Sequence, residues 1–202
     1  MKRLNYQTRV LEFVESKSRG VLFINSDFFD IASPTTIRQI LKRLTDEGKI
    51  TRIFDGMYSY LEYSSIQKDM YPSPVDVAYA IARRFKWSIY PSGYTALNIV
   101  GISTELPNGY EFLSDGPYKK YEYLNHQVKF KKTASRKINI NSRNLAILVI
   151  ALDLYGKERI KGKEIAIINK YIINKKISEK QLKQATTIPE WIYLLIKNQI
   201  NT

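Results

Sequence analysis

The stretch SPTTIRQILKRL (residues 33–44) decides how the N-terminal part of this chain folds. Ser33 is a good N-cap, and Pro34 suits the first helical position because the N–H that it lacks would have no partner there. Aliphatic residues then recur at helical spacing, as Ile37, Ile40, Leu41 and Leu44. The stretch therefore predicts an amphipathic helix.

The polar face of this helix combines hydroxyl, amide and cationic side chains. They are Thr35, Thr36, Arg38, Gln39, Lys42 and Arg43. Side chains of these types can contact base edges and backbone phosphates. A solvated helix on any small domain has a similar composition, so the neighbouring sequence has to decide between the two interpretations.

The residues around this helix predict a winged helix-turn-helix. Gly48 suits the left-handed position after a helix, and residues 50–61 then alternate around Asp55-Gly56, a dipeptide typical of hairpin turns. Upstream, residues 6–17 and 26–31 predict two more helices. Three helices followed by a hairpin make a DNA-binding module, although the same fold also docks proteins.

On the DNA-binding interpretation, each polar residue of the module has an expected role. We expect Thr35, Thr36, Arg38 and Gln39 to contact base edges. We expect Lys42, Arg43 and the wing residue Arg52 to bind phosphates, with Lys49 nearby on the same face.

The composition is that of a folded, basic protein without cysteine. The chain has 202 residues, of which 44% are hydrophobic, and 32 Lys and Arg against 19 Asp and Glu give it a net charge of +13. This charge favours a nucleic acid, an acidic protein or an anionic membrane as partner. The absence of cysteine excludes disulfides, thiolate nucleophiles and cysteine-based zinc sites.

The positive charge is concentrated outside the predicted DNA-binding module. Residues 1–63 carry 10 Lys and Arg against 8 Asp and Glu, a net of +2, whereas residues 64–202 carry a net of +11. Phosphate affinity grows with the number of phosphates neutralised. Either the module gathers its few cations on the DNA face, or the second half also contacts nucleic acid or an acidic partner.

The second half predicts a separate mixed domain, so the overall fold class is α+β. Residues 64–73 are polar and contain proline, which divides the chain into a winged helix-turn-helix at 1–63, a linker at 64–73 and an α/β domain at 74–202. We expect this domain to hold a small antiparallel sheet and to end in a helical bundle. The expected strands are residues 87–90, 110–113, 118–124 and 127–133.

Two of these strands carry cations interleaved with aromatic residues. The cations of this second basic surface are Lys119, Lys120, Lys129, Lys131, Lys132, Arg136 and Lys137. A basic and aromatic sheet face suits nucleic acid, where stacking and phosphate contacts combine. Lysines that point outward from a half-buried strand explain the same pattern, and contact with a partner protein is a third interpretation.

No catalytic or metal-binding signature is present, so we expect neither an enzyme nor a bound cofactor. His126 is the only histidine, the carboxylates are not paired, and there is no Walker or Gly-x-Ser-x-Gly sequence. An RNA- or nucleotide-processing enzyme would point first to Ser92, Lys119 and Lys132.

We expect a cytoplasmic protein that does not enter a membrane. The basic N-terminus is not followed by an apolar segment, as a secretory signal would be. The longest apolar run, residues 145–152, is far shorter than the roughly 20 residues that cross a bilayer.

Two stretches also carry a family pattern. The first includes Phe28-Phe29-Asp30, the helix residues 40–44 and Gly56-Met57-Tyr58; the second is the turn Pro91-Ser92-Gly93 followed by Ala96-x-Asn98-x-x-Gly101. Together, between residues 20 and 135, they resemble the AbiEi-like antitoxins of type IV, abortive-infection toxin–antitoxin systems.

The resemblance implies a winged helix that binds the promoter DNA of its own operon as a transcriptional repressor. It further implies a C-terminal domain that counteracts a nucleotidyltransferase toxin without necessarily forming a tight complex with it. The competing interpretations are a stand-alone transcriptional regulator and a protein-interaction adaptor whose winged helix docks a partner.

Overall fold

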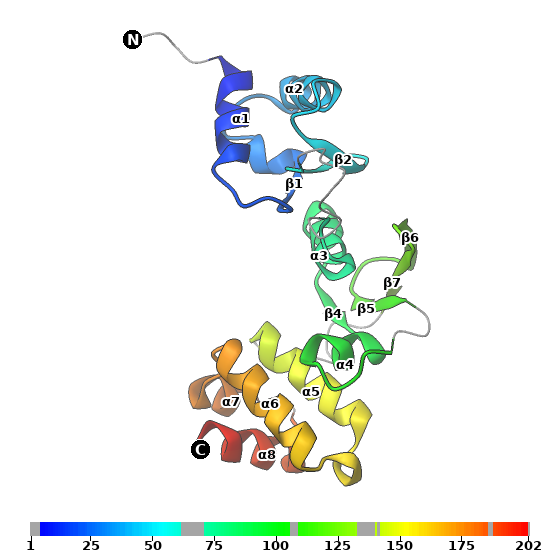
Figure 1. Cartoon of the computed structure of the whole chain (residues 1–202), viewed down its shortest axis with the longest axis vertical. Helices are drawn as coiled ribbons and strands as arrows, with labels where there is room; N and C mark the ends of the chain where they lie inside the picture. Colours follow the sequence, from blue (N-terminus) through cyan, green and yellow to red (C-terminus); the bar gives the residue numbers. More distant parts are fainter. Residues whose placement is uncertain are drawn as a thin grey trace. The chain divides into compact units, whose positions relative to one another are not determined.

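The helices and strands confirm the predicted α+β fold class. The computed structural model describes residues 5–61, 71–105, 109–132, 140, 142–185 and 188–201. It consists of two compact units, Met1–Lys86 and Trp87–Thr202, and Figure 1 labels most of their helices and strands. No helix in the described ranges has both the length and the apolar character needed to cross a membrane.

The first unit contains the predicted helices and hairpin in the expected order. Its elements are α1 (Tyr6–Glu15), β1 (Leu22–Ile24), the 3-10 helix η1 (Asn25–Phe28), α2 (Pro34–Asp46), β2 (Thr51–Phe54), β3 (Met57–Ser59) and α3 (Pro74–Phe85). The three strands form an antiparallel sheet in the order β1-β3-β2. The second of the expected helices is shorter than residues 26–31 and is reduced to η1.

Helix α2 begins and packs as its sequence predicts. Its N-cap is Ser33, whose Oγ accepts a hydrogen bond from the Thr36 amide, and Pro34 takes the first position. Its four aliphatic residues are buried in one cluster with α1, β1 and η1. The apolar face of α2 is thus fully used by the core, and the polar face remains outside it.

Strands β1 and β3 of the first sheet are buried on both faces. Phe23 and Tyr58 point into the cluster with α1 and α2, so the alternating residues Leu22, Ile24 and Met57 point to the opposite face, where they are also buried. Helix α3 contacts β1 and lies on the other side of the sheet from α1 and α2 (Figure 1).

The first unit therefore extends past the boundary expected from the sequence. Helix α3 belongs to it, although residues 74–202 were assigned to the second domain. The reason is the apolar second face of the sheet, which a winged helix ending at residue 63 would leave open to water. Residues 64–70 of the expected linker lie outside the described residues.

The second unit combines a four-stranded sheet with helices. Its elements are β4 (Ile89–Pro91), α4 (Tyr94–Val100), β5 (Tyr110–Ser114), β6 (Lys119–Tyr123), β7 (His126–Lys132), α5 (Arg143–Tyr155), the 3-10 helix η4 (Lys157–Arg159), α6 (Gly162–Asn174), α7 (Glu179–Gln184) and α8 (Glu190–Ile200). The expected C-terminal helical bundle is present, and its core lies between α4, α5, α6, α7 and α8.

This second sheet is mixed, so the expectation of an antiparallel sheet is wrong for one pair of strands. The strand order is β4-β5-β7-β6, and β5 pairs with β7 in parallel. The hairpin of β6 and β7 is antiparallel as expected. Strand β7 lies between β5 and β6, and it runs in the same direction as β5.

Candidate nucleic-acid interface

Four polar residues line the outer face of α2. Thr35, Arg38, Gln39 and Lys42 are spaced at i, i+3, i+4 and i+7, so they share one side of the helix, and all four are exposed. This line, which we call the α2 polar line, lies opposite the buried aliphatic residues. It presents a hydroxyl, an amide and two cations on a rigid helix.

Thr36 does not belong to this line. It is half-buried, and its hydroxyl oxygen lies 2.9 Å from the Ser33 hydroxyl oxygen. The two side chains thus bind each other at the start of α2. The structure places Thr36 in the helix cap rather than among the outward-facing residues.

Arg43 lies on the flank of α2 that faces α1. Its Nη1 donates to Oε1 of Gln7 at 2.9 Å, and Nε2 of Gln7 in turn donates to Oε1 of Glu47 at 3.4 Å. This chain of side chains links the two helices. Arg43 remains exposed, but its guanidinium already has a partner.

Three of the predicted cations are unpaired within the described part of the chain. Arg38, Lys42 and Lys49 are exposed, and none makes an ion pair or side-chain hydrogen bond with a described residue. Binding a phosphate through them breaks no such contact with the described residues. Arg38 and Lys42 lie together on the outer face of α2, as expected if the module gathers its few cations on the face that meets DNA.

The predicted cation of the wing, Arg52, is exposed but paired. Its Nη2 donates to Oδ1 of Asp55, the first residue of the turn between β2 and β3. Arg84, in the last turn of α3, binds Oδ2 of the same carboxylate at 3.3 Å. Asp55 therefore connects the hairpin to α3.

The charges of this turn act on the pKa of Tyr58. Burial raises the pKa of its phenol; Arg52 and Arg84 oppose that rise and Asp55 adds to it. Tyr58 lies directly opposite Arg52 in the sheet, so both side chains are on the face that packs against α1 and α2.

Two arginines of α3 were missed by the sequence interpretation. Arg84 binds Asp55, and the adjacent Arg83 donates from Nη2 to the Leu22 carbonyl at 2.9 Å and pairs with Oδ2 of Asp27 at 3.1 Å. The doublet of arginines in the last turn of a predicted helix was the available signal. With α3 included, the first unit carries 14 Lys and Arg against 10 Asp and Glu, a net of +4.

The second basic surface divides its lysines between the two faces of the sheet: Lys119 and Lys132 share the face of Phe130, and Lys120, Lys129 and Lys131 lie on the other. Lys120 lies opposite Lys129, and Tyr121 lies opposite Val128, so the two pairs point to opposite faces. Phe130 is fully buried, in ring contact with Trp87, Phe112 and Tyr121. Because Phe130 is buried, its ring offers no exposed face on which a base could stack.

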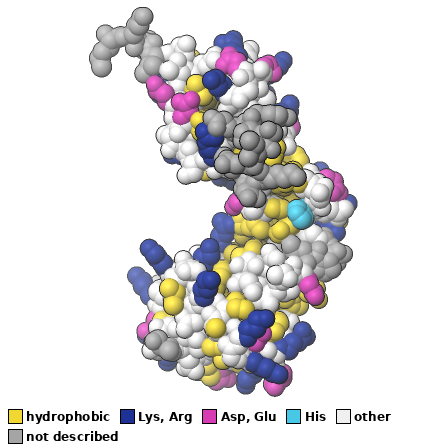
Figure 2. Space-filling view, viewed as in Figure 1, with side chains coloured by type: hydrophobic (Ala, Val, Ile, Leu, Met, Phe, Trp, Pro, Cys, Tyr) yellow, Lys and Arg dark blue, Asp and Glu magenta, His cyan; other side chains and the backbone are white. Residues whose placement is uncertain are grey.

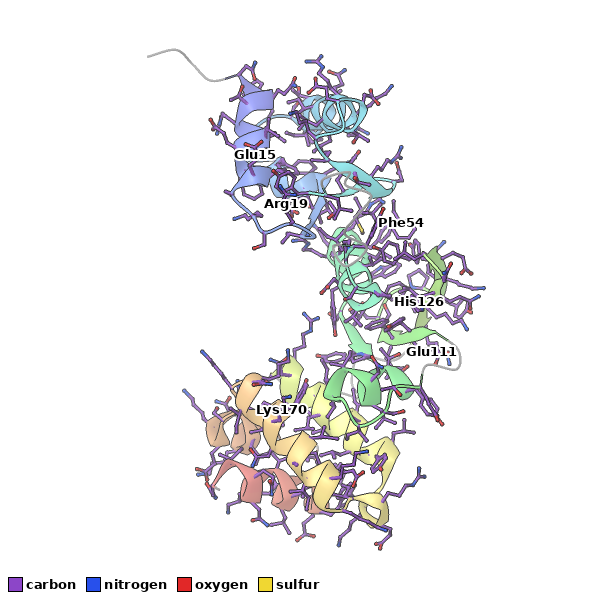
Figure 3. All side chains as sticks on the ribbon, in the orientation of Figure 1. Glu15, Arg19, Phe54, Glu111, His126 and Lys170 are labelled. Atoms are coloured by element: carbon purple, nitrogen blue, oxygen red, sulfur yellow. The ribbon has the colours of Figure 1, made fainter. Side chains whose placement is uncertain are left out.

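The lysines of this sheet are exposed or half-buried, and two of them have acidic partners. Lys131 pairs with Glu111 at 2.8 Å and Lys120 with Glu122 at 3.0 Å; Figure 3 labels Glu111 on β5 and His126 on β7. Lys119 and Lys132 are exposed, and Arg136 and Lys137 lie outside the described residues. On the face shown in Figure 2, Lys and Arg side chains are scattered over the helices of this unit.

The turn between β4 and α4 has a structural explanation. The Ser92 amide donates to the Glu111 carbonyl at 2.9 Å, and the Thr95 hydroxyl accepts from the Glu111 amide at 2.7 Å. Gly93 has φ 54° and ψ −131°, a conformation open to glycine. The turn therefore fastens α4 to β5. Within the described ranges, no group of three or more acidic or histidine side chains could hold a metal ion.

Comparison with protein families gives one assignment. Residues 9–182 match a family of unknown function, DUF6088. The chain belongs to the DUF6088 family. The match runs from α1 to α7, so in this DUF6088 protein it includes the α2 polar line, the wing, α3 and the second sheet. Comparison with curated proteins finds no match.

Proposed function

We propose that this DUF6088 protein is a sequence-specific DNA-binding regulator that represses transcription through its winged helix. The observation that carries the proposal is the α2 polar line, exposed on a helix whose apolar face is fully buried. The helix has 13 residues, about 20 Å of length. A helix of this size fits the major groove of B-DNA, which is about 12 Å wide.

The roles of the interface residues follow from their positions. Arg38 and Gln39 suit base edges, because a guanidinium binds guanine and an amide binds adenine with two hydrogen bonds each. Lys42 and Lys49 suit phosphates, which they can bind without losing an ion pair to any residue that the structure describes. Arg43 holds α1 against α2 in addition to any contact with DNA.

Substitution of the α2 polar line tests the proposal. Binding of the full-length protein is measured on a labelled duplex from the region upstream of its own gene and on an unrelated duplex of equal length. We expect Arg38→Ala to cost about 1–3 kcal/mol on the upstream duplex and to relax sequence preference. We expect Lys42→Ala to weaken binding to both duplexes by the same factor.

Arg9→Ala is the matched control, because Arg9 is an exposed cation on α1, away from the polar line. If Arg38→Ala and Lys42→Ala bind both duplexes as the unmodified protein does, the proposed reading face is incorrect. A salt series distinguishes an adaptor, since binding to DNA should fall steeply as the salt concentration rises.

On the resemblance to AbiEi-like antitoxins, we extend the proposal to a role in the cytoplasm as the antitoxin of a type IV system. The turn that fastens α4 to β5 coincides with the more specific of the two resembling stretches. The test is co-expression with a nucleotidyltransferase encoded in the adjacent reading frame. We expect growth to be restored by the full chain, and restoration by residues 1–86 alone would contradict a role of the second unit.

A further inference from the structure

Two arginines converge on one exposed carboxylate at the tip of the wing. Asp55 binds Nη2 of Arg52 on its own hairpin and Nη2 of Arg84 on α3. Arg84 also donates from Nη1 to the backbone carbonyl of Asp55. The side chains of Asp55, Arg52 and Arg84 are 80%, 53% and 32% exposed, respectively, so the whole cluster is open to a ligand.

The cluster adds little to the stability of the fold. Ion pairs at such exposure are screened by water and contribute little. Arg84 is also held by the Asp55 carbonyl, so its guanidinium keeps one anchor if the carboxylate leaves. An arginine pair prearranged around a weakly held anion is what a ligand of the same charge and shape requires.

A phosphate of the DNA backbone carries the same single negative charge and likewise presents two oxygens that accept hydrogen bonds. Guanidinium groups bind carboxylates and phosphates through the same planar, two-donor geometry. The Asp55 carboxylate therefore occupies the place that two phosphate oxygens would take between Arg52 and Arg84.

The cluster also lies near α2, the helix proposed to contact DNA. Arg52 lies opposite Tyr58, on the sheet face that packs against α2, and the hairpin follows α2 after four residues. Arg84 reaches the same turn from α3, on the other face of the sheet. With one acid and two bases, the tip has a net charge of +1.

We propose that Arg52 and Arg84 form a phosphate site for the DNA backbone, in which Asp55 holds both guanidinium groups until a phosphate displaces it. The inference rests on the proposed function and deepens it. It adds Arg84, which lies outside the winged helix expected from the sequence, to the residues that contact DNA. No covalent bond changes, and the displaced Asp55 carboxylate rotates into the solvent.

The test is the salt dependence of DNA binding by the full-length chain. The logarithm of the affinity is plotted against the logarithm of the salt concentration for the upstream and the unrelated duplex. We expect Arg84→Gln to weaken binding to both duplexes by the same factor. We also expect it to lower the magnitude of the slope by about 1, because one fewer phosphate is neutralised. Arg84→Lys, which keeps the charge, should retain the slope.

Asp55→Asn tests the displacement step. Removing the competing carboxylate should tighten binding to both duplexes by about two- to fivefold, the range implied by the loss of an exposed ion pair. Arg83→Gln is the matched control: Arg83 binds Asp27 and the Leu22 carbonyl, away from the tip, so it should leave the slope unchanged. Thermal unfolding of each variant verifies its fold.

The outcomes separate this inference from the proposed function. A protein that binds neither duplex in a salt-dependent manner contradicts both. A protein that binds DNA while Arg84→Gln keeps the original slope, or while Asp55→Asn weakens binding, contradicts the phosphate site alone.

Discussion

At the scale of single residues, Gly56 shows how closely the wing turn and α3 are fitted together. Its φ is +65°, and a Cβ placed on it would lie 3.3 Å from Cζ of Arg84 and 3.3 Å from Nδ2 of Asn25. Any other residue at this position would both strain the backbone and crowd the guanidinium that binds Asp55.

We therefore predict that Gly56→Ala lowers both stability and DNA affinity. The left-handed backbone costs about 1 kcal/mol for alanine, and the crowding adds to it. Gly48→Ala is the matched control, because Gly48 has a similar φ of +70° with nothing within 4 Å of its Cβ. Chemical unfolding and binding to the upstream duplex are the measurements. Equal effects in the two variants would show that contact with Arg84 is unimportant.

Gly116 gives a second prediction at this scale, in the second unit. A Cβ there would lie 2.4 Å from Cε2 of Trp87, whose ring packs on Phe130. We expect Gly116→Ala to destabilise the unit by about 1–3 kcal/mol, as overpacking a core does. Gly162→Ala, where nothing lies within 4 Å, should not. Thermal unfolding followed by tryptophan fluorescence measures the difference.

The sequence predicted the outward residues of α2 because helical periodicity alone determines them. It did not predict that Arg43 binds Gln7 or that Arg84 binds Asp55, since these partners are 36 and 29 residues apart. Such pairings depend on how distant elements pack. Thr36 was misplaced for a local reason, because a threonine three residues after an N-cap serine can turn back to it.

At the scale of elements, helix α6 begins with a charge-dependent cap. Oε2 of Glu164 accepts the Lys161 amide at 3.1 Å. Hydrogen bonds from the backbone amides of Glu164 itself and of Lys161 lower the pKa of this carboxyl. A folded-state pKa below the unfolded value means that the ionised group stabilises the fold above the unfolded pKa.

We predict that this contribution is lost in acid. It should be present at pH 7 and disappear as the pH falls below the ordinary glutamate pKa of about 4.3 and through the lower folded value. Glu164→Gln should therefore lower the unfolding temperature at pH 7 and match the unmodified protein near the acid end of a pH series. A constant difference at every pH would contradict the role of the charge.

The strands show where element-level prediction stops. All four strands of the second sheet were expected near their observed positions, because alternating apolar and polar residues mark them. Their order was not, since alternation specifies which face a residue occupies and not which strand lies beside it. The parallel pair of β5 and β7 is therefore a feature that only the folded chain reveals.

At the scale of the whole molecule, the boundary after Lys86 has a measurable consequence. We predict that residues 1–86 fold and bind DNA alone, whereas residues 1–63 do not fold. Without α3, the buried side chains of Leu22, Ile24 and Met57 would face water. Each contributes about 1.5–3 kcal/mol when buried, so their sum is comparable with the stability of a small domain.

Circular dichroism melting of the two fragments measures this difference. Residues 1–86 should unfold in one cooperative transition, and residues 1–63 should show none. A cooperative transition in the shorter fragment would mean that α3 is dispensable for the module.

The place of β6 at the rim of the second sheet affects how any mutational survey of the protein should be interpreted. The free edge of a strand can pair with a strand of another molecule. Lys119 and Lys120 on β6 disfavour such pairing between identical molecules by charge repulsion. Replacing these lysines with alanine would promote self-association, so a loss of DNA binding in such a variant would reflect aggregation. Charge reversal to glutamate, which removes the cation and keeps the repulsion, is the substitution that isolates a role in binding.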